Sequence, residues 1–137
     1  MIETQFNVTV GLIIRTAMQL DLITKIMEIS PSKIIQNFNE YPISSETEYS
    51  GIWVFRKQFK QQKDVDSCIE AFFECIPNIK EKVRQVNYFG NSTLRISLVS
   101  EYGQIGFSLS PNNQHLLSEM DMPFEVSIFS YGMCIDE

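Results

Sequence analysis

The sequence lacks most of the features that mark a catalytic or metal-binding protein. It contains one histidine, His115, and three cysteines without Cys-x-x-Cys or His-x-x-x-His spacing, so these residue types alone do not form a closed zinc site. It also has no Gly-x-Gly-x-x-Gly, no phosphate loop and no Gly-x-Ser-x-Gly, the glycine-containing motifs that cradle phosphates or expose a nucleophile. We therefore expect no cofactor, no metal and no catalytic residue.

Long hydrophobic runs and a basic N-terminal segment are also missing. The longest apolar run is a few residues, far short of the roughly 20 that a spanning helix needs. The start of the chain does not have the pattern of a signal peptide. Cys68 and Cys75 are seven residues apart on a predicted helix, a rise of about 10 Å that exceeds the reach of a disulfide. The sequence predicts a reduced, cytoplasmic protein that does not contact membranes.

Basic residues are fewer than acidic ones. The 137 residues include 11 Lys and Arg against 17 Asp and Glu, which gives a net charge of −6. Such a charge repels phosphate backbones, so we expect no nucleic-acid partner. The 44% hydrophobic content, with six Gly and five Pro, predicts one globular domain over 1–137 with a core from about 5 to 131.

The hydrophobic periodicity predicts both strands and helices. In the first half of the chain, we expect a strand over 6–15, a helix from about 21 that stops at Ser30-Pro31, a short strand near 34–35, and a polar loop over 39–50. A strand over 51–57 and helices over 64–76 and 79–86 follow. The rest is predicted to form strands over 94–98 and 105–109 joined by a turn at 101–104, a helix that begins at Ser110-Pro111, and a strand over 124–131. The order predicts an α+β fold with helices on one face of a mostly antiparallel sheet. Two strand-helix-strand halves suggest a ferredoxin-like arrangement.

Alternation along the strands assigns side chains to the two faces of the predicted sheet. The inward set is Phe6, Val8, Val10, Ile52, Val54, Leu94, Ile96, Phe107, Leu109, Phe124, Val126 and Ile128. The outer face is then expected to carry Asn7, Thr9, Trp53, Phe55, Arg95, Ser97, Ser108, Glu125, Ser127 and Phe129. The segment over 52–55 is apolar at every position, which indicates that this strand is covered on both faces or that one of its faces is a contact surface.

The predicted outer face has the composition of a protein-protein contact. The expected binding residues are Trp53, Phe55, Arg95, Glu125, Ser127 and Phe129, which combine aromatics, one Arg and short hydroxyl side chains. An RNA-binding sheet also exposes aromatics, but it needs basic surroundings, which the net charge and Glu125 do not provide. The alternative is that the 39–50 loop or a second copy of the chain covers Trp53 and Phe55, the second copy forming a homodimer.

The remaining candidates for chemistry are isolated. A nucleophilic pair would need His115 beside Cys68, Cys75 or Cys134, and Cys68 lies on the core stripe of its helix. We predict a non-catalytic protein-binding module, in one version an immunity-like inhibitor of a basic partner, because complementary charge accelerates encounter. The alternative is a small-molecule-binding domain or an enzyme of unknown reaction.

Several short segments in a fixed order resemble those of a known family. They are Ile26–Ser32, Gly51-Ile-Trp53, Phe107–Pro111 followed by Leu116-Leu117, and Phe124–Ile128. Together they resemble a bacterial family catalogued as a domain of unknown function, number 4279, over about residues 5 to 131. This chain has Asn39-Glu40 where the family tends to have Gly-Asp, and Ser127 where it tends to have Asp. The resemblance implies the α+β fold and a bacterial cytoplasmic setting, and it implies no reaction.

Overall fold

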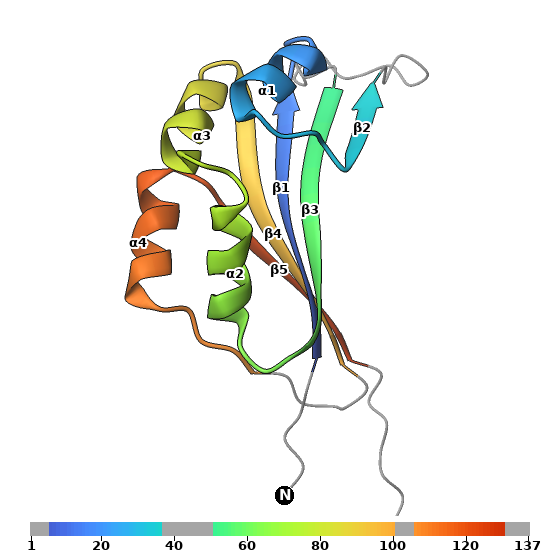
Figure 1. Cartoon of the computed structure of the whole chain (residues 1–137), viewed down its shortest axis with the longest axis vertical. Coiled ribbons are helices and arrows are strands. Elements are labelled where there is room, and N and C mark those ends of the chain that lie inside the picture. The colour runs from blue at the N-terminus through green and yellow to red at the C-terminus, as the bar shows by residue number, and fades with distance from the viewer. Residues whose placement is uncertain (1–5, 37–50, 101–105, 131–137) are drawn as a thin grey trace, which may run out of the picture.

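A computed structural model describes residues 6–36, 51–100 and 106–130. These residues form five strands and four helices (Figure 1). The elements are β1 (Phe6–Thr16), α1 (Leu20–Met27), β2 (Lys33–Gln36), β3 (Gly51–Gln62), α2 (Val65–Glu74), α3 (Ile79–Asn87), β4 (Gly90–Ser100), α4 (Pro111–Glu119) and β5 (Phe124–Ser130). The α+β prediction is confirmed, and β3 and β4 extend further than their hydrophobic patterns indicate.

The strands form one sheet in the order β2-β3-β1-β4-β5. β1 is antiparallel to both β3 and β4, and β2 is antiparallel to β3. The first four strands are therefore two interlocked strand-helix-strand units, each split by a strand of the other, which is the ferredoxin-like arrangement. β5 is parallel to β4 and extends this sheet at one edge.

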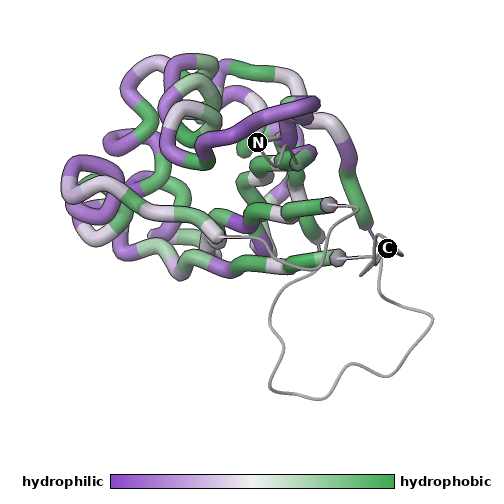
Figure 2. Tube along the Cα trace, turned by 90° about the horizontal axis from the view of Figure 1, so that it is seen from below, coloured by the Kyte–Doolittle hydropathy of each residue, from purple (hydrophilic) through white to green (hydrophobic). Residues whose placement is uncertain are grey.

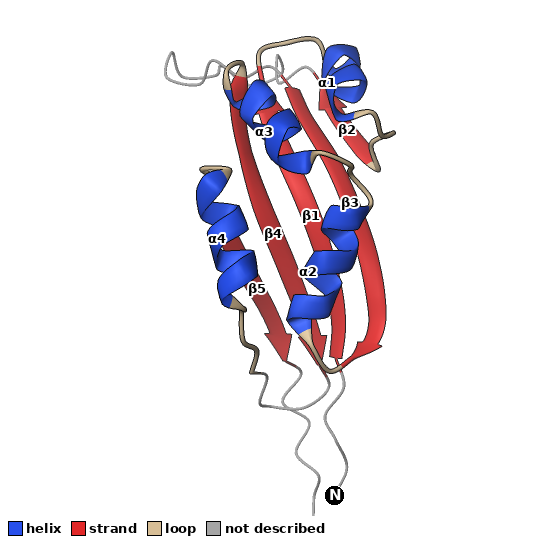
Figure 3. Cartoon of the chain, turned by 60° about the vertical axis from the view of Figure 1, so that its left-hand side comes forward, coloured by secondary structure: helices blue, strands red, loops and turns tan. Residues whose placement is uncertain are grey.

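All four helices lie on one side of the sheet (Figure 3). The side chains of β1 that face them are Phe6, Val8, Val10, Leu12 and Ile14, all buried in the core, and the first three confirm the predicted inward positions. Hydrophobic and hydrophilic stretches alternate along the trace (Figure 2), and the second half of β3 is mostly Lys and Gln. The opposite side of the sheet, which no described helix covers, is called the outer face below.

Local sequence signals fix the helix ends. Asp64 caps α2 by accepting a hydrogen bond from the Asp66 backbone N–H at 3.0 Å, and Ser110 caps α4 in the same way. Pro77 falls in the break between α2 and α3, as expected for a residue that removes a helical hydrogen bond.

The segment before α4 differs from the prediction. Residues 106–110 form no strand, and the turn predicted at 101–104 lies outside the described residues, as does the loop at 39–50. Because β5 is parallel to β4, the chain has to cross back along the sheet before β5 begins, and α4 makes that crossing. The carboxylate of Asp66 in α2 accepts a hydrogen bond from the Ser110 N–H at 2.9 Å and so holds residues 106–110 near the helices. These residues connect to the helix layer and do not form the predicted hairpin strand.

Candidate interaction surface

The register of β3 decides which predicted contact residues reach the outer face. Trp53 pairs with Ile14, whose side chain is in the core, so Trp53 points toward the helices. It is fully buried, and its indole N–H donates to the Thr24 hydroxyl of α1 at 3.0 Å. The prediction that Trp53 lies on the outer face is wrong.

Phe55 lies on the same face of the sheet as Trp53, the side that the helices cover. It packs against the core, and its ring centroid is 5.4 Å from that of Phe72 in α2. The outward neighbours are Ile52 and Val54, which the sequence analysis placed inward. In a segment that is apolar throughout, periodicity leaves the facing undetermined, and here the larger aromatic side chains fill the space beneath the helices.

The other four predicted residues do lie on the outer face. Arg95 pairs with Glu125, Ser97 with Ser127, and Val99 with Phe129, all on β4 and β5. Arg95 Nη2 and Glu125 Oε1 form an ion pair at 3.2 Å, with both side chains more than two-fifths exposed. Exposed pairs of this kind contribute little stability, so this pair orients the Arg95 side chain more than it stabilises the fold. Phe129 is 58% exposed.

The predictions for Ser108 and for the inward residues of 105–109 and 124–128 are confirmed only in part. Ser108 is exposed on a segment that belongs to no strand. Leu109 packs against the core, as predicted, whereas Phe107 is exposed. Val126 and Ile128 face the helix side as predicted, but β5 is at the sheet edge and leaves them 37% and 51% exposed.

The outer face is richer in positive charge than the sequence average suggests. Cross-strand pairing places on this face the cations Arg15, Lys33, Arg56 and Arg95 and the anion Glu125. Among them lie polar side chains from Thr9, Gln58, Ser97 and Ser127 and apolar ones from Ile13, Ile35, Ile52 and Val54. This mixed, cationic surface is the candidate interaction surface. Arg15, Lys33 and Arg56 are absent from the predicted contact residues. The facing of Arg15 follows from the alternation along β1, whereas Lys33 and Arg56 are placed on this face by the register of β3.

Charge is distributed unevenly along the chain. All eleven Lys and Arg residues lie in the described ranges, whereas only ten of the seventeen Asp and Glu residues do. The described part therefore carries a net charge of +1, eleven positive against ten negative, with His115 neutral. The net charge of −6 is a property of the whole chain and not of the outer face.

Comparison with known proteins identifies the family. The model of the family described as Domain of unknown function (DUF4279) matches residues 4–131. The chain belongs to the DUF4279 family. The match includes every described strand and helix, in agreement with the resemblance found in the sequence. No curated protein and no solved structure matches the chain.

A polar groove lies on the helix side of the DUF4279 domain. It has a volume of about 290 Å³ and is lined by Arg84, Asn87, Tyr88, Glu119, Met120 and Asp121, from the ends of α3 and α4. Tyr88 is 86% exposed. The groove thus offers a cation, carboxylates and an aromatic ring to a small polar molecule.

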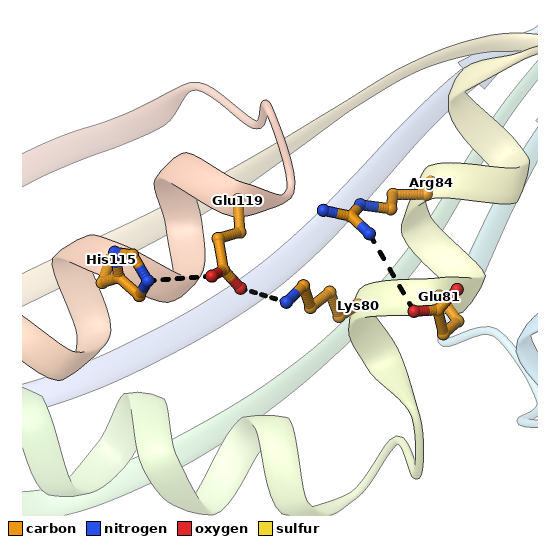
Figure 4. A network of polar contacts seen from close by, with 5 residues as sticks. All are labelled: Lys80, Glu81, Arg84, His115 and Glu119. Atoms are coloured by element: carbon orange, nitrogen blue, oxygen red, sulfur yellow. Dashed lines mark ion pairs between the residues drawn. The ribbon is translucent and has the colours of Figure 1, made fainter.

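His115 belongs to a charge network at the edge of this groove (Figure 4). Its Nε2 lies 2.8 Å from Glu119 Oε1, and the other Glu119 oxygen contacts Lys80. Hydrogen bonding from Lys80, with the positive charges of Lys80, His115 and Arg84, lowers the pKa of Glu119, and partial desolvation opposes this. Since the His115 side chain is 76% exposed and none of the described cysteines is bonded to it, the network links α3 to α4 at the surface.

The two described cysteines differ in environment. Cys68 is buried, and burial together with the Asp64 charge raises the pKa of its thiol from 9.0 to about 11. Cys75 is half-buried, and Lys57 Nζ donates to its Sγ at 3.5 Å. Both are free thiols, as predicted, and Cys134 lies outside the described residues.

Within 6–36, 51–100 and 106–130, no three His, Cys, Asp or Glu side chains come together as a metal site. In the same ranges, no helix is both long and apolar enough to cross a membrane.

Proposed function

We propose that this chain is a non-catalytic protein-binding module of the bacterial cytoplasm that contacts its partner through the outer face. The observation that carries the proposal is the asymmetry of the sheet, in which four helices cover one side and a cationic, partly apolar surface forms the other. A sheet face with exposed cations around an apolar centre can exclude water and still orient a partner.

Three residues of this surface suit a contact role. Phe129 supplies an exposed aromatic ring, and Arg56 and Arg95 supply planar guanidinium groups. Arg and aromatic side chains are the residue types that most often dominate protein-protein binding energy. Ile13 and Val54 form an apolar pair on the other side of the arginine row from Phe129, and Ile13 itself is only 8% exposed.

An immunity-like inhibitor, which masks a single target by covering its surface, is a module of this kind. The prediction of a basic target depends on the net charge of the whole chain. The outer face has four cations and one anion, so a target that meets this face gains from acidic groups.

The proposal is tested by capturing a partner from extracts of the native host with the tagged chain. We expect a protein that binds the wild type to be lost with Phe129→Ala and retained with Tyr88→Ala, because Phe129 is on the outer face and Tyr88 is an exposed aromatic on the helix side. Retention with Phe129→Ala and loss with Tyr88→Ala would contradict the proposed surface. Capture of no protein by the wild type would contradict the proposed function itself.

A small-molecule-binding function is the second candidate, and the groove between α3 and α4 is the observation that favours it. A thermal-shift screen of small polar metabolites tests it. A hit should stabilise the wild type and lose its effect in Tyr88→Ala and Arg84→Ala, whereas Phe129→Ala should respond as the wild type does.

A further inference from the structure

Two arginines on the outer face flank a glycine in one cross-strand row. Gly11, at the middle of β1, pairs with Arg56 of β3 on one side and with Arg95 of β4 on the other. Glu125 of β5 continues the row beyond Arg95. The row therefore crosses four adjacent strands, with its two guanidinium groups on either side of a position that has no side chain.

Gly11 places no side chain between the two arginines. A Cβ built on Gly11 would make ordinary van der Waals contacts, at 3.6 Å to Arg56 Cβ and at 3.9 and 4.0 Å to the carbonyl oxygens of Arg95 and Phe55, so this position accommodates a side chain without a clash. With adjacent strands about 4.8 Å apart, the backbones of Arg56 and Arg95 are separated by roughly 10 Å. That interval is wide enough for a partner's carboxylate to approach between the two side chains, and Arg95 would then share its guanidinium group between this carboxylate and Glu125.

The positive charge of this row is only partly neutralised. Glu125 accepts from Arg95 Nη2 at 3.2 and 3.3 Å. The side chains of Arg56, Arg15 and Lys33 have no acidic partner among the described residues. By contrast, Lys80, Lys82 and Arg84 on the helix side are each within 4.0 Å of a glutamate. As far as the described ranges extend, Arg15, Lys33 and Arg56 can therefore pair with the acidic groups of a partner.

We propose that the outer face binds an acidic segment of a partner protein, with one carboxylate of that segment held over Gly11 between Arg56 and Arg95. This inference rests on the proposed protein-binding function and names the chemistry of the partner. Arginine pairs with carboxylate through two parallel hydrogen bonds, which gives both energy and orientation. The neighbouring hydroxyls of Thr9 and Ser97, one row further along the strands, can donate to the same segment.

The test uses a short fluorescein-labelled peptide that alternates Glu and Ser, titrated with the full chain and followed by fluorescence anisotropy at low ionic strength. Arg56→Glu should weaken binding about tenfold, whereas Lys57→Glu should change it less than about twofold. The two substitutions are matched, because the residues are adjacent on β3, make the same charge change and point to opposite faces. If both variants weaken peptide binding equally, the effect comes from the net charge of the protein and not from the outer face, and the proposal is wrong.

A second pair of variants addresses the space over Gly11. Gly11→Glu places a tethered carboxylate between the arginines and should abolish peptide binding, and Gly11→Gln, which has nearly the same shape without the charge, should retain most of it. Circular dichroism of all variants establishes that they are folded. If Gly11→Gln also abolishes binding, the loss does not depend on the introduced charge, and the proposed carboxylate site between the two arginines is wrong.

Other probes decide the class of partner. A peptide that alternates Lys and Ser should not bind, and a single-stranded oligonucleotide of similar length should bind more weakly than the Glu-Ser peptide. If the oligonucleotide binds more tightly than the Glu-Ser peptide, the partner is a nucleic acid and the proposal of an acidic protein is wrong. If the host partner is lost with Phe129→Ala but is insensitive to both Arg56→Glu and Gly11→Glu, the outer face remains the contact surface and the acidic chemistry is wrong.

Discussion

The indole of Trp53 is buried between β3 and α1, and its N–H is satisfied by Thr24. A buried side chain of this size contributes through its apolar area and its packing. Trp53 is the single tryptophan of the chain, so its fluorescence reports on this one contact between sheet and helix layer.

Replacing this side chain should damage the fold and not the surface. We expect Trp53→Ala to lower the free energy of unfolding by about 3–5 kcal/mol, because it opens a large cavity and removes the bond to Thr24. Phe129→Ala, at an exposed aromatic, should stay within about 0.5 kcal/mol of wild type. Urea denaturation followed by circular dichroism measures both. Comparable effects from the two variants would contradict the burial of Trp53.

The two described thiols should also behave differently. At pH 8, Cys75 should be alkylated by iodoacetamide in the folded protein while Cys68 is protected, because Cys68 is buried and its pKa of about 11 keeps the thiol protonated. Peptide mapping by mass spectrometry separates these sites from Cys134. Alkylation of Cys68 at the rate of Cys75 without denaturant would be inconsistent with the structure.

The raised pKa of Cys68 has a definite sign for stability. An unfolded thiol loses its proton near pH 9.0, whereas the folded one keeps it up to about pH 11. Between these values the unfolded state binds fewer protons, so stability falls as pH rises through this window. Cys68→Ala should reduce this alkaline loss in denaturant titrations. An unchanged pH dependence in Cys68→Ala would show that other groups determine it.

At the scale of elements, a buried polar link joins α2 to the start of α4. Asp66 Oδ1 accepts from the Ser110 N–H and from Asn113 Nδ2, each at 2.9 Å, and Asn113 is only 4% exposed. Asp66→Ala leaves both donors without this acceptor and should cost about 1–3 kcal/mol in urea denaturation. Glu70→Ala, at an exposed position of the same helix, is the control and should be nearly neutral. Equal stability of the two variants would show that the link is dispensable.

The α3–β4 junction shows a requirement for glycine that no periodicity reveals. A Cβ on Gly90 would lie 2.0 Å from the Arg15 carbonyl oxygen, a distance that real atoms do not adopt. Since Gly90 pairs with Thr16 at the end of β1, any larger residue would force these strand ends apart.

The strands with polar residues on one face were predictable from sequence, and the strand without them was not. β1 and β4 alternate apolar with polar side chains, which fixed their facing correctly. β3 begins with four apolar residues, and its facing follows from pairing with β1, a long-range contact that no local pattern encodes. The candidate site lost Trp53 and Phe55 for this reason and gained Arg56 and Lys33.

At the scale of the whole molecule, the distribution of charge matters more than its sum. The net charge of −6 led to the prediction of a basic partner, yet the described residues carry +1 and the outer face holds four cations. Composition does not report on this because seven of the acidic residues lie outside the described ranges. The charge of a contact surface on the sheet therefore follows from the strand register, which determines the residues on that face, and not from the isoelectric point of the chain.

Methyl NMR tests most directly whether the outer face is the contact surface. The isoleucine methyls divide by face: Ile13, Ile35 and Ile52 lie on the outer face, whereas Ile34 and Ile128 lie on the helix side of the same sheet. Titration of an isoleucine-labelled chain with its captured partner should shift the signals of Ile13, Ile35 and Ile52 and leave those of Ile34 and Ile128 in place. Shifts confined to Ile34 and Ile128 would contradict the claim.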